Sequence, residues 1–267
     1  MPYYLFNHLT ALSKFRTSEE LAIITDVDGT ISEIAPTPGE AEVSDSMSNL
    51  LIALNKKFKL VGVISGRSLS NVRDMVGVDG ILYVGNHGLE YLKNGEKFIE
   101  PEAEKYCLKM EELYKELENH HISKLEGLKL EDKKIGLCIH YRQCPSGEEA
   151  REKIRLALKQ LLNSDELKIS SGRKIIEIKP PLIQDKGTIL EKIVEEYNLK
   201  QLIYLGDDVT DYDAFTKLEE LEKKKNMETA SILVLSKEIP IYVKNSAKYY
   251  LNSVLEVQRF FEWLLYK

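Results

Sequence analysis

Short, uninterrupted hydrophobic runs recur along the chain and are separated by more polar stretches. The five clearest runs are LAIIT (21–25), LVGVI (60–64), ILYVG (81–85), LIYLG (202–206) and SILVL (231–235). Runs of this length without polar alternation are typical of strands that are buried on both faces. The pattern therefore predicts a buried, mostly parallel β-sheet.

Hydrophobic residues at helical spacing lie between these runs. Ser44 is a candidate N-cap for a helix whose apolar positions fall within 47–54. The same spacing over 189–197 predicts a helix after Asp185. Because strands alternate with helices, the expected fold class is α/β with a doubly wound parallel sheet. Polar residues interrupt the apolar N-terminal segment, so it predicts an amphipathic helix and not a signal peptide.

The middle of the chain follows a different pattern. A helical stripe over 103–117 precedes GLKLE (127–131) and IGLCIHYR (135–142), which predict a hairpin. The hydrophobic positions of the second run alternate with Cys138 and His140, so they occupy opposite faces of a strand.

A second helix and two further strands complete this middle section. The helix is expected within 150–161, and the strands at ELKIS (166–170) and KIIEIK (174–179). The chain is therefore expected to form a sheet domain from 1–102 and 182–267, with an α/β domain inserted over 103–181.

Charge and composition exclude several classes of function. The net charge is −6 and no basic tract occurs, so nucleic acid is not an expected partner. No apolar run is long enough to span a membrane. The three cysteines include no CxxC pair, which argues against a disulfide framework or zinc site and favours a reducing cytoplasm.

Two carboxylates directly follow the first predicted strand. Asp26 and Asp28 stand two residues apart and precede Gly29. Ligands of open α/β sheets bind at the carboxyl ends of strands. Mg²⁺ would offset the repulsion between the two carboxylates, and one of them could attack a phosphoryl group while the other transfers protons.

Three further candidates lie at similar positions. Ser65 and Gly66 follow the second strand, where a hydroxyl and backbone N–H groups suit phosphate oxygens, although a turn or helix cap is an alternative. Lys186 begins a helix, where a cation needs an anionic partner unless it is simply solvated. Asp207 and Asp208 follow the fourth strand and suit a hard cation. For Asp211 and Asp213, which come soon after, helix capping is plausible.

In this order, the four elements resemble the haloacid-dehalogenase superfamily of phosphotransferases. The resemblance implies that Asp26 is the nucleophile and that Asp28 is the acid and base. It further implies that Ser65 and Lys186 hold the phosphoryl group. The implied Mg²⁺ ligands are Asp26, Asp28, Asp207 and Asp208. The inserted domain resembles the α/β cap of that superfamily, which confers substrate specificity.

Within that superfamily, the chain is similar to trehalose-6-phosphate phosphatases. The more specific motifs are GNHGLE (85–90), LEDK (130–133), HYRQCP (140–145) and EIKP (177–180). The implied substrate-binding residues are Gly29, Gly66, Arg67, His87, Glu90, Glu131, Lys133 and Glu177. Two positions depart from the family pattern, because Tyr212 stands where Glu is usual and Lys134 where Gly is usual.

The resemblance implies a Mg²⁺-dependent phosphoric monoester hydrolase that converts trehalose 6-phosphate to trehalose and phosphate. Such an enzyme belongs to trehalose biosynthesis and would act beside a trehalose-phosphate synthase in the cytoplasm. A mannosyl-3-phosphoglycerate or sucrose-phosphate phosphatase is the nearest alternative. A non-catalytic regulatory module is the alternative from another class, and the complete carboxylate set argues against it.

Overall fold

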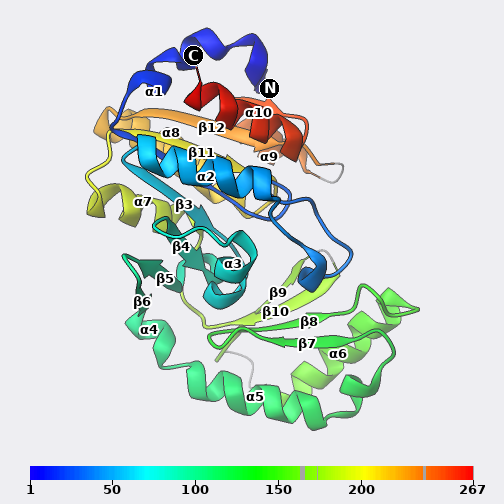
Figure 1. The fold of residues 1–267 in the computed structure, drawn as a ribbon. Helices are drawn as coiled ribbons and strands as arrows, with labels where there is room; N and C mark the ends of the chain where they lie inside the picture. Colours follow the sequence, from blue (N-terminus) through cyan, green and yellow to red (C-terminus); the bar gives the residue numbers. More distant parts are fainter. Residues whose placement is uncertain (163–165, 173, 237–238, 267) are drawn as a thin grey trace. The chain divides into compact units, whose positions relative to one another are not determined.

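The computed structural model describes residues 1–162, 166–172, 174–236 and 239–266. The chain divides into two compact units, Met1–Phe98 with Gln184–Lys267 and Ile99–Ile183. We call the first the core unit and the second the inserted unit (Figure 1). Catalysis by the core unit and specificity from the inserted unit remain predictions.

The core unit is organised around one large sheet. Among the described residues, nine strands form it in the order β1-β13-β12-β11-β2-β3-β4-β5-β6. In chain order, the strands are β1 (Tyr3–Tyr4), β2 (Leu21–Thr25), β3 (Leu60–Ile64), β4 (Leu82–Gly85), β5 (Glu90–Lys93), β6 (Glu96–Ile99), β11 (Gln201–Gly206), β12 (Glu228–Val234) and β13 (Tyr249–Leu251). The pairs from β1 to β4 are parallel, and β5 is antiparallel to β4. The five strands predicted from hydrophobic runs are confirmed as β2, β3, β4, β11 and β12.

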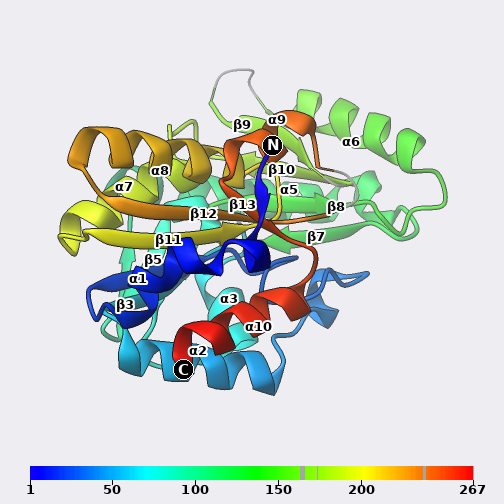
Figure 2. The ribbon, with the colours of Figure 1, turned by 90° about the horizontal axis from the view of Figure 1, so that it is seen from above.

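Helices cover both faces of this sheet (Figure 2). On one face lie α2 (Asp45–Lys57), α3 (Leu69–Val76) and α10 (Val254–Leu265), and on the other α7 (Lys186–Glu196), α8 (Asp211–Lys225) and α9 (Ile241–Ser246). Each face has its own hydrophobic cluster, which explains why the central strands are apolar throughout. The predicted doubly wound α/β fold is confirmed.

The strand order reverses direction at β2. From β2 the chain adds β3 and β4 on one side, and after the inserted unit it adds β11 and β12 on the other. The carboxyl ends of β2, β3 and β11 therefore lie next to one another at a topological switch point. Open α/β sheets bind their ligands at such a point.

Side-chain caps fix the starts of two helices, and the sequence predicted the first of these caps. The Ser44 hydroxyl accepts a hydrogen bond from the Met47 N–H at 3.3 Å and caps α2. Asp185 and Thr188 form a reciprocal capping box at the start of α7. The capping box fixes the backbone at the first residue of α7, Lys186, and so sets the position from which the Lys186 side chain extends.

The N-terminal segment does not form the predicted amphipathic helix. It forms β1 and then three short elements, η1 (Leu5–Asn7), η2 (Leu9–Leu12) and α1 (Ser13–Thr17). Tyr3 and Tyr4 pair in parallel with the last strand of the sheet, and Leu5, Leu12 and Phe15 are buried in the core. Strand pairing satisfies backbone polar groups of this segment, and the three buried side chains anchor it on the core at separate points.

The inserted unit contains a second, smaller sheet. Its elements are α4 (Pro101–Glu104), α5 (Cys107–Asn119), η5 (His121–Lys124), β7 (Lys129–Asp132), β8 (Leu137–His140), α6 (Gly147–Leu161), β9 (Lys168–Gly172) and β10 (Ile175–Lys179). The four strands are antiparallel in the order β7-β8-β10-β9, so the predicted hairpin is confirmed. The single helix expected over 103–117 is interrupted between α4 and α5.

The core unit also contains two short turns. Short 3₁₀ turns lie at η3 (Pro38–Glu40) and η4 (Asn86–Gly88). Among the described residues, no helix has the length and hydrophobicity needed to span a membrane.

Cys138 is buried, although it lies on the face of β8 opposite the alternating hydrophobic positions. It is 1% exposed because Glu131 and Glu177, its partners on the two neighbouring strands, flank it on the same face. Burial is the main cause that raises the pKa of its thiol to about 12. Cys107 and Cys144 are only half-buried.

We therefore expect two of the three thiols to react with a disulfide reagent such as DTNB in the native protein at pH 8. The thiolate is the reactive form, and Cys138 offers neither a thiolate nor access. A Cys138→Ala variant should keep the native count of two and lower the denatured count from three to two. Three thiols of equal rate in the native protein would contradict this assignment.

Candidate active site

Three predicted site residues lie at the carboxyl edge of the core sheet. Asp26 follows β2, Ser65 follows β3 and Asp207 follows β11, which are neighbouring strands. All three are buried, with exposed fractions of 6%, 1% and 2%. Buried polar side chains need partners, so their contacts define what the site can do.

Lys186 supplies the central positive charge of this edge. Its Nζ lies 2.7 Å from Asp26 Oδ1 and 2.7 Å from Asp211 Oδ1. The side chain is 2% exposed and comes from the first turn of α7. The anionic partner that a lysine at a helix N-terminus requires is therefore a pair of carboxylates.

Asp211 is a site residue that was not among the predicted metal ligands, because helix capping was a plausible alternative for it. The N-cap of α8 is Thr210, and Asp211 is the first residue of the helix. Its carboxylate accepts hydrogen bonds from the Tyr204 hydroxyl at 2.6 Å and from the N–H groups of Asp207 and Asp208 at 3.0 and 2.9 Å. A Cβ on Gly206 would lie 2.2 Å from Asp211 Cγ, so the glycine makes room for this carboxylate. The glycine before the acidic run is the sequence signal that could have identified the role of Asp211.

Burial and the neighbouring charges shift the pKa values of this cluster. Burial is the main cause that raises the pKa of Asp26, and Asp211 adds to the rise while Lys186 opposes it. Burial likewise raises the pKa of Asp207 well above its ordinary value, with Asp26 and Asp211 adding to the rise. Burial alone would lower the pKa of Lys186, but the two neighbouring carboxylates outweigh it and raise that pKa. The site therefore holds more negative charge than Lys186 can balance.

The same residues fit a hard divalent cation. One oxygen each from Asp26, Asp207 and Asp211 lie within 4.8 Å of one another. Gly29 has φ +83°, and a Cβ there would lie 2.3 Å from Asp207 Oδ2, so only glycine allows this close approach. An all-oxygen donor set of carboxylates suits Mg²⁺. Asp208, also predicted as a ligand, accepts a hydrogen bond from the Val209 N–H at 2.7 Å and is outside this group.

Asp28, the predicted acid and base, is bound by Arg67. The guanidinium donates through Nε to Asp28 Oδ2 and through Nη2 to Asp28 Oδ1, both at 2.7 Å. Its Nη1 donates to Asn71 Oδ1 at 2.7 Å, which fixes the orientation of the guanidinium. Arg67 was predicted to bind substrate, and here it orients a neighbouring carboxylate in a bidentate pair.

Two loops that follow β3 and β4 pack together. The Ser65 hydroxyl accepts a hydrogen bond from the Arg67 N–H at 3.1 Å. A Cβ on Gly66 would lie 2.6 Å from His87 Nε2, so the imidazole packs on the glycine. Glu90 is 1% exposed and accepts from the Leu69 N–H and the Asn86 amide, each at 2.7 Å. Glu90 therefore joins the loops from inside, and its predicted contact with substrate remains a prediction.

The predicted substrate residues of the inserted unit lie together on its sheet. Lys133 Nζ is 3.0 Å from Glu177 Oε1, and Lys179 Nζ is 2.7 Å from Glu177 Oε2. Glu131 Oε2 is 2.7 Å from the His140 Nε2 atom. The sequence identified three of these five residues, and the resemblance placed no role on His140 or Lys179.

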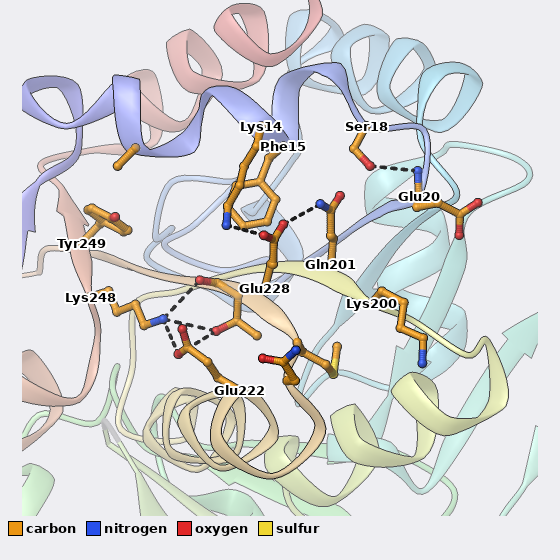
Figure 3. Close-up of a pocket in the computed structure, with 14 residues that line it drawn as sticks. Lys14, Phe15, Ser18, Glu20, Lys200, Gln201, Glu222, Glu228, Lys248 and Tyr249 are labelled. Atoms are coloured by element: carbon orange, nitrogen blue, oxygen red, sulfur yellow. Dashed lines mark hydrogen bonds and ion pairs between the residues drawn. The ribbon is translucent and has the colours of Figure 1, made fainter.

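A separate pocket of about 790 Å³ lies at the opposite edge of the core sheet (Figure 3). Its wall includes Gln201 and Glu228, the first residues of β11 and β12. Lys14 is paired there with Glu228, and Lys248 with Glu222. Two ion pairs therefore balance part of the charge in this pocket.

Removing the Lys186 charge should destabilise the protein. Without the ammonium, the carboxylates of Asp26 and Asp211 would be buried with no cation between them, which costs about 3–5 kcal/mol. We expect Lys186→Met to lower the free energy of unfolding by that amount in urea titrations with EDTA. The matched control is Lys217→Met, because Lys217 pairs with the more exposed Glu191 and should contribute only about 0–1 kcal/mol. Equal effects of the two variants would refute the buried charge arrangement.

Comparison with known proteins agrees with this geometry. The family model described as Trehalose-phosphatase matches residues 24–254. "Probable trehalose-phosphate phosphatase 4" of Oryza sativa subsp. japonica is 32% identical over 228 residues, covering 79% of this chain and 60% of that protein. "Probable trehalose-phosphate phosphatase E" of Arabidopsis thaliana is 30% identical over 285 residues, covering 98% of this chain and 76% of that protein.

A solved structure extends the agreement to the fold. The C-terminal domain of C. albicans trehalose-6-phosphate phosphatase matches with a TM-score of 0.77 at 24% identity, covering 99% of this chain and 97% of that chain. The chain spans about 60% of the length of the rice relative. Because the family model covers most of the chain, the resemblance drawn from the motifs is confirmed, and the chain belongs to the trehalose-phosphatase family.

Proposed function

We propose that this protein hydrolyses α,α-trehalose 6-phosphate to trehalose and phosphate through a phospho-aspartate on Asp26. The observation that carries the proposal is the grouping of Asp26, Asp207 and Asp211 around one point, with Lys186 between two of them. Family membership supports the phosphatase chemistry and the sugar-phosphate class of substrate.

In the first step, a carboxylate oxygen of Asp26 attacks phosphorus and the bond from phosphorus to the sugar oxygen breaks. The Lys186 ammonium, 2.7 Å from Asp26 Oδ1, orients the nucleophile and stabilises charge on the phosphoryl oxygens. The leaving sugar oxygen takes a proton from Asp28. Because Arg67 binds both oxygens of Asp28, one of these bonds must open before Asp28 can deliver a proton.

In the second step, water attacks the phosphorus of the acyl phosphate and Asp28 accepts the proton of that water. The bond between phosphorus and Asp26 breaks, which releases phosphate and regenerates the carboxylate. A bound Mg²⁺, held by Asp26 and Asp207 with Asp211 nearby, would neutralise charge on the phosphoryl group during both steps. Asp28 and Asp208, the other ligands implied by the resemblance, would complete its surroundings.

The remaining predicted residues would bind the substrate. Ser65 would donate to phosphoryl oxygens beside the glycines at 29 and 66, with Arg67, His87 and Glu90 close to them. From the inserted unit, Glu131, Lys133 and Glu177 would contact sugar hydroxyls. Polar groups that must pair with particular hydroxyls can discriminate strongly between sugars. We further propose that the protein works in the cytoplasm beside a trehalose-phosphate synthase that supplies its substrate.

The decisive experiment measures phosphate release from a panel of sugar phosphates at saturating Mg²⁺. We expect trehalose 6-phosphate to exceed glucose 6-phosphate in kcat/KM by about 10²-fold or more. An EDTA arm should abolish turnover, and added Mg²⁺ should restore it. Preference for mannosyl-3-phosphoglycerate or sucrose 6-phosphate would assign the alternative substrate, and parity with glucose 6-phosphate would refute the proposal. No turnover of any phosphate ester would indicate a regulatory module.

A single substitution tests the nucleophile. Asp26→Asn keeps the shape of the side chain but removes the attacking carboxylate, so kcat should fall by on the order of 10⁴-fold or more. Circular dichroism and the melting profile should still indicate a folded protein. Asp74→Asn is the matched control, because Asp74 is exposed on α3 and should leave kcat unchanged. Retained activity in Asp26→Asn would assign the nucleophile elsewhere.

A further inference from the structure

The inserted sheet carries two carboxylates in one cross-strand row. Glu131 on β7 and Glu177 on β10 both pair in register with Cys138 on the strand between them. Residues in register share a face, and two strand spacings separate the carboxylate positions by roughly 9–10 Å along the backbone. Both side chains remain partly exposed, at 28% and 14%. The row therefore presents two accessible carboxylates separated by a short, buried spacer.

The two carboxylates make different close contacts, although the Lys133 ammonium interacts electrostatically with both. Lys133 and Lys179 bind one oxygen each of Glu177, so both of its oxygens have a cationic neighbour. Glu131 is held by His140, whose Nε2 lies 2.7 Å from Glu131 Oε2. Because Lys129 pairs with His140 and Glu131 pairs with Cys138, the two residues are diagonal neighbours across β7 and β8. The side chains of Glu131 and His140 therefore reach diagonally toward each other between β7 and β8. Their hydrogen bond fixes the direction in which the Glu131 carboxylate points.

Binding of a sugar depends on such fixed acceptors. A glutamate side chain that is free to rotate loses conformational entropy when a hydroxyl binds it, whereas a carboxylate already held in place does not. A hydrogen bond to a charged group is strong enough to hold the carboxylate in one orientation. The His140 ring is 18% exposed and thus largely packed, so it is a rigid support.

We propose that His140 is a positioning residue for sugar recognition: its Nε2–H holds the Glu131 carboxylate in the orientation that accepts a sugar hydroxyl. This inference rests on the proposed function. It adds a residue that is not expected to contact the substrate itself. It also implies that binding of a sugar hydroxyl by Glu131 depends on the His140 imidazole beside it.

Glu131, Cys138 and His140 could also hold a soft metal ion, since one ligand atom from each lies within 4.8 Å of the others. Two features favour the positioning role. The buried Lys133 ammonium interacts electrostatically with both Glu131 and Cys138, and it would repel a cation. Cys138 is buried as a neutral thiol, while a metal ligand must be a thiolate.

The test compares His140→Leu with His140→Gln. Leucine removes the donor, whereas the glutamine amide offers an N–H at a similar distance from the backbone. We expect His140→Leu to raise KM for trehalose 6-phosphate about 10- to 100-fold with little change in kcat. His140→Gln should recover most of that loss. Turnover of 4-nitrophenyl phosphate, which lacks a sugar, should be unchanged in both variants.

A double-mutant cycle with Glu131→Gln tests whether His140 acts through Glu131. If it does, His140→Leu should add little to the effect of Glu131→Gln on KM. Additive effects, or equal losses with the sugar phosphate and 4-nitrophenyl phosphate, would overturn the positioning role. Stoichiometric zinc in the purified protein that is lost in Cys138→Ala would overturn it in favour of a metal site.

The outcomes also separate this inference from the proposed function. If the unmodified protein hydrolyses 4-nitrophenyl phosphate and no sugar phosphate, the sugar specificity is wrong and so is the inference. If it hydrolyses trehalose 6-phosphate and His140→Leu behaves in the same way, only the inference is wrong.

Discussion

The structure depends on one buried charge arrangement, the Lys186 ammonium between Asp26 and Asp211. Removing three charges from water is costly, and only their attraction and additional hydrogen bonds offset that cost. The Tyr204 hydroxyl and the backbone N–H groups after β11 supply such bonds to Asp211. The end of β2, the start of α7 and the loop after β11 are therefore held to one another at a single point.

The charge balance of this point indicates its chemistry. Asp26, Asp207 and Asp211 contribute three negative charges when ionised, and Lys186 contributes one positive charge. A divalent cation would bring the sum to zero. Burial is the main cause of the raised pKa values of Asp26 and Asp207, and the neighbouring carboxylates add a repulsion that such a cation would relieve. The excess of carboxylates thus suits a site that binds a cation. In a site with only a structural role, the same excess would destabilise the fold.

The sequence predicted the core strands and the position of the site because both depend on local pattern. Uninterrupted apolar runs identify buried strands, and polar residues directly after them identify the carboxyl edge. The sequence did not identify β5 and β6, because neither strand is an uninterrupted apolar run: β5 reads EYLK and is buried or half-buried, and β6 reads EKFI and is mostly exposed. It also assigned no site role to Asp211, because that role depends on how the loop after β11 folds back and does not follow from spacing.

The core unit is assembled from two stretches of chain that are separated by the whole inserted unit. The contact between Asp26 and Lys186 joins residues 160 positions apart, and the second parallel neighbour of β2, which is β11, also comes after the inserted unit in the chain. Contacts of such long range form slowly, whereas the inserted unit has its sheet and helices within one continuous stretch. During synthesis, when the chain has been made only as far as the inserted unit, one edge of β2 is unpaired and Asp26 lacks its positively charged partner. Asp26 and its charge partner Lys186 can therefore come together only after the chain beyond the inserted unit has been made.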